Sequence, residues 1–241
     1  MLTYATITNE GDRKVNEDSI GVFKNEYGTC FIICDGLGGH GMGDVASGIV
    51  RDVFENLFSK TDDIVKFTGE TLTAAQEVLM TEQTIRNEKR KMKTTAVSLT
   101  TDGKTVYIGH IGDSRLYAFS RGKVKFRTID HSVPQMLALS RQIKDEEIRY
   151  HPDRNLLLRV MGTDWDSPMY ELHEPVSLKK YQAFLLCSDG FWELIDEKTM
   201  CSLLKKSKSA EEWLNNMTEI VKHNGENKDM DNYSAIAVWN K

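Results

Sequence analysis

Residues 31–44, FIICDGLGGHGMGD, decide the fold, because three structural signals follow one another within this short stretch. An apolar run at 31–34 ends at Asp35, a cluster of glycines follows, and a helical pattern begins near Asp44. This order predicts a buried strand, a tight loop and a helix, with Asp35 at the open end of the strand. A bare carboxylate at such a position is costly unless it is paired or binds a cation. We therefore expect this loop to form the floor of an active site.

The rest of the chain adds no sign of a second domain. No Pro/Gly/Ser-rich linker or internal repeat divides the 241 residues, so we expect one domain over residues 1–241. A formal net charge of -5 and a pI near 5.7 argue against a nucleic-acid or membrane-surface partner. No apolar run approaches the ~18–20 residues of a membrane span. The first residues also lack the layout of a signal peptide.

The four cysteines are Cys30, Cys34, Cys187 and Cys201. They form no C-x-x-C pair, so we expect no zinc site built on them. Without a secretion signal, free thiols in the cytoplasm are the expected state. Cys34 and Cys187 lie in apolar strand patterns and are predicted to be small core residues.

Hydrophobic periodicity predicts helices at 44–58, 62–90 and 209–225. Alternating patterns separated by turn signals predict strands at 94–100, 105–110, 116–119, 123–128, 170–176, 183–187 and 234–239. Strands and helices come in blocks rather than in strict alternation. This order favours an α+β fold over a doubly wound parallel sheet.

The glycines at 36, 38 and 41 match the spacing of a dinucleotide-binding fingerprint between a strand and a helix. However, Asp35 would point negative charge at a pyrophosphate. Glu55, the acidic residue about 20 positions further on, lies in a predicted helix and not at the end of a second strand. The flanking strands also have an antiparallel pattern. A nucleotide-binding oxidoreductase is therefore the weaker alternative.

Four aspartates lie where an apolar strand ends or begins: Asp35, Asp113, Asp189 and Asp231. One such aspartate is usually a turn residue, but four, together with Glu17 and Asp18, suggest a metal site. Mg²⁺ and Mn²⁺ prefer oxygen ligands. Two such ions about 3.5–4 Å apart can activate a bridging water. From the residues alone, turn residues and a carboxylate-rich metal site remain alternatives.

Seven sequence blocks, in this order over nearly the whole chain, resemble those of the metal-dependent protein phosphatase family (type 2C-like). They are Arg13-x-x-Asn16-Glu17-Asp18; Asp35-Gly36-Leu37-Gly38-Gly39-His40; Thr94-Thr95-Ala96; Gly109-His110-Ile111-Gly112-Asp113-Ser114-Arg115; Asp130-His131-Ser132; Ser188-Asp189-Gly190; and Asp231-Asn232-Tyr233-Ser234. Each block alone is a weak signal, but seven in the family's order are specific. The chain is similar to the stand-alone bacterial serine/threonine phosphatases of this family.

The resemblance implies a four-layer α-β-β-α sandwich, in which helices flank two central antiparallel sheets and the metal site occupies a cleft at one end. It implies two Mn²⁺ or Mg²⁺ ions, bridged by Asp35, with the Gly36 carbonyl completing one coordination shell. The implied reaction is a one-step hydrolysis of phosphoserine or phosphothreonine, in which metal-bound hydroxide attacks phosphorus in line.

The resemblance also implies roles for the other acidic residues. Asp189 and Asp231 would hold one ion. Glu17 and Asp18 would act on the other, largely through bound waters. Asp113 matches a residue that serves a third, weaker ion together with Asp189.

Arg13 matches the family's phosphate-binding arginine, and Asn232 would be a neighbour of the metal ligands. The chain departs from the family at Leu37, where some members carry a histidine proposed as general acid, so the proton source is open. His40 could supply this proton or could be structural. Lys93 replaces a common glycine, and its side chain would either crowd the turn or face solvent.

Residues 134–159 correspond to the family's flap, a loop beside the cleft that could gate access and select substrates. We expect a cytoplasmic, monomeric enzyme that acts on phosphorylated proteins and opposes a serine/threonine kinase, with no nucleic-acid or membrane partner. A catalytically weak pseudophosphatase or phosphoprotein-binding regulator is the alternative, but a pure binding role does not require the full set of aspartates.

Overall fold

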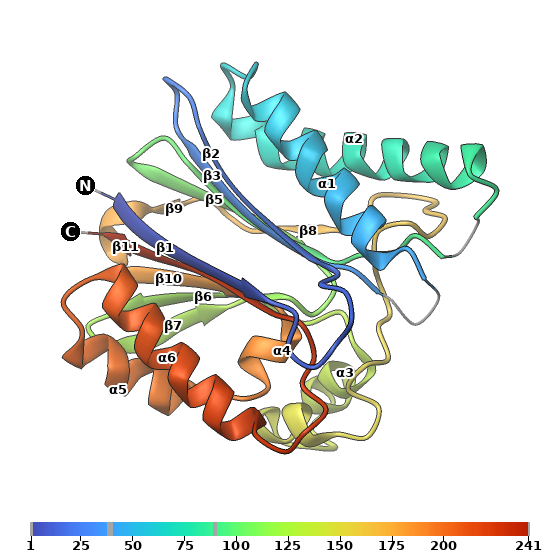
Figure 1. The fold of residues 1–241 in the computed structure, drawn as a ribbon. Coiled ribbons are helices and arrows are strands. Elements are labelled where there is room, and N and C mark those ends of the chain that lie inside the picture. The colour runs from blue at the N-terminus through green and yellow to red at the C-terminus, as the bar shows by residue number, and fades with distance from the viewer. Residues whose placement is uncertain (1, 38–40, 89–90, 241) are drawn as a thin grey trace.

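The computed structural model describes residues 2–37, 41–88 and 91–240 (Figure 1). Two antiparallel sheets pack face to face, and helices cover the outer face of each, which confirms the predicted four-layer α-β-β-α sandwich. The first sheet has the spatial order β1 (Leu2–Asn9), β11 (Tyr233–Asn240), β10 (Ala183–Cys187), β6 (Arg115–Ser120) and β7 (Lys123–Arg127). The second has the order β2 (Asp18–Lys24), β3 (Thr29–Asp35), β4 (Ala96–Thr101), β5 (Thr105–Ile111) and β8 (Glu171–Leu172), and β9 (Val176–Ser177) also pairs with β5.

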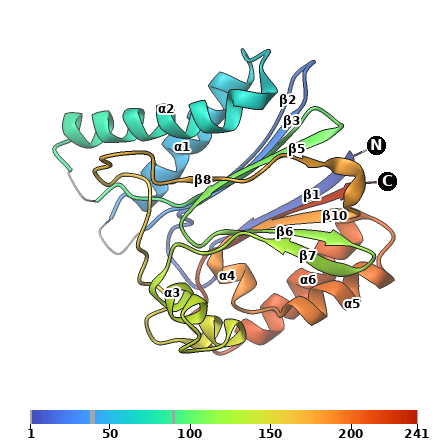
Figure 2. The same ribbon diagram turned by 180° about the vertical axis from the view of Figure 1, so that it is seen from behind.

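The helices divide between the two outer faces (Figures 1 and 2). The second sheet is covered by α1 (Gly43–Phe58) and α2 (Ile64–Ile85), and the first sheet by α5 (Glu197–Lys206) and α6 (Ala210–Gly225). The connections contain α3 (Val133–Leu139), α4 (Asp189–Trp192) and the 3-10 helices Asp145–Tyr150 and Leu178–Lys180. None of the helices in the described part of the chain has the length and apolar character needed to span a bilayer.

The core forms three layers because the central strands are apolar on both faces. On β3, Phe31 and Ile33 pack between the two sheets, whereas Cys34 packs under α1 and α2. Cys187 on β10 packs under α5 and α6. Both cysteines are fully buried free thiols, as predicted.

Antiparallel pairing also decides whether the glycine-rich stretch is a dinucleotide-binding fingerprint. β3 runs antiparallel to both of its neighbours, β2 and β4. A dinucleotide fingerprint belongs to a parallel βαβ unit, so the oxidoreductase alternative is not supported.

The structure differs from the sequence prediction at several boundaries. The strand predicted at 170–176 is two short strands, because residues 173–175 interrupt it and Pro175 cannot donate a ladder hydrogen bond. The helix predicted to reach residue 90 ends at Ile85, and Asn87 adopts a left-handed backbone with φ 54°. Sequence analysis also missed β2 and α5.

Candidate active site

The alternation of side chains along the strands brings acidic residues to one end of the layer between the sheets. On β3, Asp35 follows Phe31 and Ile33 at a spacing of two residues, so the strand directs all three side chains toward the other sheet. On β2, Asp18 stands two residues before Ile20, which packs in the same layer. Asp18 and Asp35 face each other across the β2–β3 pair.

The Thr94–Thr95 pair fixes the backbone of Asp35. The Asp35 carbonyl accepts hydrogen bonds from the Thr95 N–H and the Thr94 hydroxyl, both at 2.9 Å, and its N–H donates to Thr95 Oγ1 at 3.1 Å. Thr95 Oγ1 is in turn 2.7 Å from Ser114 Oγ. The Thr-Thr block therefore positions a carboxylate and does not itself line the cleft.

Gly36 is required by close backbone packing. Its N–H donates to the Glu17 carbonyl at 3.1 Å, and a Cβ here would overlap the carbonyl oxygens of Gly43 and Glu17. Ser47 on α1 also donates to the Glu17 carbonyl, at 2.6 Å. The start of α1 and the turn before β2 thus lock Glu17 beside Gly36.

Asp189 begins α4, directly after β10. Gly190 approaches Asn232 so closely that a Cβ would overlap its carbonyl oxygen. The preceding residue, Ser188, donates its hydroxyl proton to Asp18 Oδ2 at 2.8 Å. This bond crosses from the first sheet to the second and holds the Asp18 carboxylate in the interior.

Asp231 precedes β11 and forms a fork-to-fork pair with Arg13. Arg13 Nε and Nη2 each donate to one Asp231 oxygen at 3.2 Å, and Nη1 donates to Asp229 at 3.1 Å. Asn232 fastens the N-terminal loop beside this pair. Its Nδ2 donates to the carbonyls of Glu10 and Val15, and its Oδ1 accepts from the Glu17 N–H at 2.8 Å.

Asp113 lies in the turn between β5 and β6. Its carbonyl accepts a hydrogen bond from Trp192 Nε1 at 3.0 Å, so this buried tryptophan also positions the turn. The Arg115 guanidinium lies 3.4 Å from the centroid of the Trp192 ring and pairs with Asp130 at 2.9 and 2.6 Å. Arg115 and Asp130 are fully buried, which gives these two motif residues a structural role.

These elements surround a cleft of about 800 Å³. Its acidic lining residues are Glu17, Asp35, Asp113, Asp189 and Asp231, and its basic lining residues are Arg13, Lys14 and Lys93. Gly36 and Leu37 also line it, whereas Asp18 lies behind it. His40, the other possible proton donor, lies outside the described residues.

Electrostatics mark the cleft as a cation site. Burial and the charge of Asp189 raise the pKa of Asp35 well above its ordinary value, and the same causes raise the pKa of Asp113. Burial and Asp231 raise the pKa of Asp189, and burial raises that of Glu17. Burial also raises the pKa of Asp18 to about 7. Buried carboxylates that repel one another suit hard divalent cations, which accept oxygen ligands.

The carboxylates that line the cleft do not form one tight cluster. Within the described residues, no three of them bring one oxygen each to within 4.8 Å of the others. Asp231 is engaged by Arg13. Cations in this cleft would therefore compete with the guanidinium for Asp231, and Arg13 would then be free to bind an anionic ligand.

Sequence analysis missed part of the lining. Lys14 and Val15 come from the N-terminal loop, and a second group comes from the segment that follows α3: Asn155, Leu156, Leu157 and Val160. Lys14 stands at an unspecified position of the Arg13-x-x-Asn16 block, and the other side chains are apolar or neutral, so none carries a motif signal. Lys93 lines the cleft, and its carbonyl accepts a hydrogen bond from the Leu37 N–H at 2.9 Å.

Comparison with known proteins connects this geometry to a family. Residues 8–233 match the family model described as "Protein phosphatase 2C". The serine/threonine phosphatase stp of Listeria monocytogenes is 28% identical over 207 residues, which cover 83% of this chain and 81% of that protein.

Solved structures share the fold. The serine/threonine phosphatase Stp1 from Staphylococcus aureus superposes with a TM-score of 0.90 at 30% identity, covering 100% of this chain and 96% of that one. The catalytic domain of the serine threonine protein phosphatase PstP, solved in complex with 2 manganese ions, has a TM-score of 0.80 at 24% identity, covering 99% and 97%.

Proposed function

Because this chain belongs to the protein phosphatase 2C family and is a metal-dependent serine/threonine protein phosphatase, we propose that its cleft binds two Mn²⁺ or Mg²⁺ ions. The observation that carries this proposal is the set of five acidic residues from both halves of the sandwich that line one cleft. A third ion at Asp113 and Asp189 is part of the proposal, since burial and the charge of Asp189 raise the pKa of Asp113.

We propose for these residues the ligand roles that the family's motifs imply. Asp35 would serve both ions, and the Gly36 carbonyl would serve one of them. Asp189 and Asp231 would hold one ion. Glu17, which lines the cleft, and Asp18, held by Ser188 behind it, would act on the other ion largely through water.

The chain's own residues orient the substrate. Bound divalent ions supply an activated water as nucleophile and neutralise phosphoryl charge. The planar guanidinium of Arg13 can donate two parallel hydrogen bonds to two phosphoryl oxygens. Lys93 adds positive charge to the lining of the cleft. No described lining residue is a histidine, and Leu37 has no proton to donate. We propose solvent water as the proton source for the serine or threonine leaving group, with His40, which lies outside the described residues, as the alternative.

The flap suits a protein substrate. Apolar side chains at its surface include Met136, Leu139, Leu156 and Leu158, each at least half exposed. Leu156 also lines the cleft, so a bound peptide would contact the flap on either side of its phosphorylated residue. We propose that the flap selects among phosphorylated proteins.

The remaining proposals concern the cell. We propose that residues 1–241 act as a single, monomeric catalytic domain in the cytoplasm, without a nucleic-acid or membrane partner. The buried free thiols support a reducing compartment. The opposing enzyme is a serine/threonine kinase that phosphorylates the same proteins.

Phosphate release from a phosphothreonine peptide, measured with Mn²⁺ and then with excess EDTA, tests the proposal. We expect turnover with Mn²⁺, loss on chelation, and recovery when Mn²⁺ is restored. Turnover that persists in EDTA after dialysis would refute the metal assignment. Mn²⁺ binding without phosphate release would instead favour the phosphoprotein-binding alternative.

A further inference from the structure

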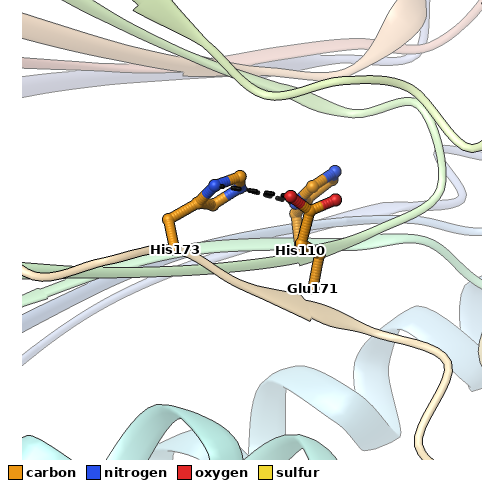
Figure 3. Close-up of side chains that lie close together, drawn as sticks. All are labelled: His110, Glu171 and His173. Atoms are coloured by element: carbon orange, nitrogen blue, oxygen red, sulfur yellow. Dashed lines mark hydrogen bonds and ion pairs between the residues drawn. The ribbon is translucent and has the colours of Figure 1, made fainter.

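A cluster of three histidines and one glutamate lies apart from the carboxylate cleft. His110 is on β5, Glu171 is on β8 and His173 follows β8 (Figure 3). The fourth residue, His131, precedes α3. None of the four residues lines the cleft. The cluster sits where the β5–β8 edge of the second sheet approaches the end of β7 in the first sheet (Figure 2).

His110 occupies a position where an apolar side chain is expected. Val106 and Ile108 on β5 pack between the sheets, and alternation gives His110 the same face. The imidazole is fully buried, and its Nε2 lies 2.9 Å from the Ile129 carbonyl. A carbonyl only accepts, so Nε2 carries the proton and neutral His110 presents a lone pair at Nδ1.

His173 and Glu171 face that lone pair. His173 Nε2 lies 3.2 Å from His110 Nδ1, and the two ring planes differ by 13°. Glu171 Oε1 lies 3.6 Å from His173 Nδ1. One ligand atom from each of these three residues falls within 4.8 Å of the others. Two nitrogens that share a tetrahedral Zn²⁺ at ~2.0–2.1 Å lie about 3.3 Å apart, close to the spacing seen here.

His131 gives an independent indication that a ligand belongs here. Its Nδ1 accepts the Gly112 N–H at 3.2 Å, so its proton is on Nε2. That atom is buried, in a residue that is only 8% exposed, and has no hydrogen-bond partner in the described part of the chain. It lies 3.7 Å from Glu171 Oε2. A buried N–H in this position suits the outer shell of a metal site, where it would orient the glutamate or a water ligand.

The protonation states are those that metal binding needs. Burial lowers the pKa of His110 and His173, and it lowers that of His131 to about 3. All three are therefore neutral at neutral pH. The side chain of Glu171 is 44% exposed and that of His173 is 14% exposed, which gives an ion a route from solvent.

We propose that His110 Nδ1, His173 Nε2 and the Glu171 carboxylate form a second metal site, which binds a borderline transition-metal ion such as Zn²⁺. Imidazole ligands favour such ions over Mg²⁺, whereas the cleft offers oxygen ligands. An ion bound here joins β5 to the edge strand β8 and, through His131, to the loop that leads into the flap.

Zn²⁺ binding to the full chain, with the cleft kept saturated by Mg²⁺, tests this proposal. Equilibrium dialysis gives the stoichiometry and affinity, and ¹⁵N NMR of the histidine rings identifies the ligating nitrogens. We expect the Nδ1 signal of His110 and the Nε2 signal of His173 to shift. His173→Gln and Glu171→Gln should each weaken Zn²⁺ binding at this site by at least ~10-fold. Replacing buried His110 is avoided because its loss would also disturb packing.

The matched controls are Glu174→Gln, which removes a neighbouring charge outside the cluster, and His223→Gln on the exposed face of α6. Both should keep the wild-type affinity. Circular dichroism and Mg²⁺-dependent phosphatase activity verify that each variant is folded. Ring signals that stay unchanged in excess Zn²⁺, or equal Zn²⁺ affinity in His173→Gln and wild type, would overturn the proposal and leave a hydrogen-bonded histidine pair.

Discussion

Asp35 combines a buried carboxylate with a pKa raised by burial and by Asp189. Asp35→Asn keeps the shape of the side chain but removes its charge. We expect phosphate release to fall by more than ~100-fold, since even outer-shell changes at metal sites cost 10–100-fold. The free energy of unfolding in EDTA should not fall, because a disfavoured charge is removed.

Asp62→Asn, at an exposed aspartate before α2, is the control for both measurements. Near-normal turnover by Asp35→Asn would show that Asp35 is no metal ligand.

Arg13 should act mainly in binding. Its fork can bind Asp231 or phosphate, and charge-assisted hydrogen bonds contribute about 1.5–3 kcal/mol. We expect Arg13→Ala to raise KM for a phosphopeptide by roughly 10–100-fold, with a smaller fall in kcat, and to weaken inhibition by inorganic phosphate in parallel. Arg13→Lys should recover only part of the affinity, because an ammonium cannot donate two parallel hydrogen bonds from a planar group.

Arg86→Ala, which breaks an exposed ion pair with Glu82 on α2, is the control. A large fall in kcat at unchanged KM would contradict this role.

The acidic residues that line the cleft could be predicted from the sequence, one by one. Each aspartate follows or precedes an apolar strand and stands beside a small or polar residue. The sequence could not reveal their partners. The Arg13–Asp231 pair and the Ser188–Asp18 bond join residues far apart in the chain, and local pattern carries no information on such contacts. The same holds for His131 Nε2, which has no hydrogen-bond partner among the described residues.

Two arginines fasten the flap to the elements that follow Asp189. Arg149 Nη1 donates to the carbonyls of Trp192 and Ile195 at 2.6 and 2.9 Å. Arg154 Nε donates to Glu193 Oε2 at 2.9 Å. The flap is therefore linked to the C-terminal end of α4 and to the residues that follow it.

Glu193 makes this link dependent on pH. Burial raises its pKa from 4.5 to about 7. A raised carboxyl pKa gives stability that is present below the unfolded pKa and is lost as pH rises through the folded value. From pH 5 to pH 8, wild type should therefore lose stability relative to Glu193→Gln, on the order of 1–3 kcal/mol. Urea unfolding of both proteins in EDTA across this range measures the difference. A constant difference would show that Glu193 ionises normally.

Element prediction succeeded where a pattern was long or strongly apolar, as for α1 and β10. It failed for β2, which lies at a sheet edge and is only partly buried, and for α5, which has just 10 residues and two buried positions. β8 and β9 are separate strands because they pair with different parts of β5: β8 pairs with Gly109 and His110, and β9 with Thr105 and Val106. Such pairing is set by tertiary contacts rather than by local propensity.

On the scale of the whole molecule, the acidic lining residues come from both sheets. Asp35 belongs to the second sheet, and Asp189 and Asp231 flank strands of the first. Cations bound between them would cross-link the sandwich and stabilise the native state, by about 2.7 kcal/mol per site at 100 times Kd. We expect Mn²⁺ to raise the Tm relative to EDTA, with a much smaller rise in Asp35→Asn. Differential scanning calorimetry measures both, and an equal rise in the two proteins would place the ions elsewhere.

The layered architecture was foreseen through the family resemblance, whereas the residue pattern alone indicated only an α+β fold with antiparallel strands. Strand order could not be derived locally. β11 lies between β1 and β10, although more than 200 residues separate β1 from β11. Only the complete set of long-range pairings decides which strand occupies the middle of a sheet.

The pairing of β1 with β11, from Leu2 opposite Asn240 to Asn9 opposite Tyr233, has a consequence for biosynthesis. Until the ribosome has made the last residues, β1 has no strand to pair with, and Arg13 cannot form its ion pair with Asp231. We therefore expect a nascent chain to be inactive until residues 231–240 have emerged, because β11 completes the first sheet. Until then the unpaired β1 and β10 edges are exposed to other chains, which makes this interval the one in which a chaperone would matter.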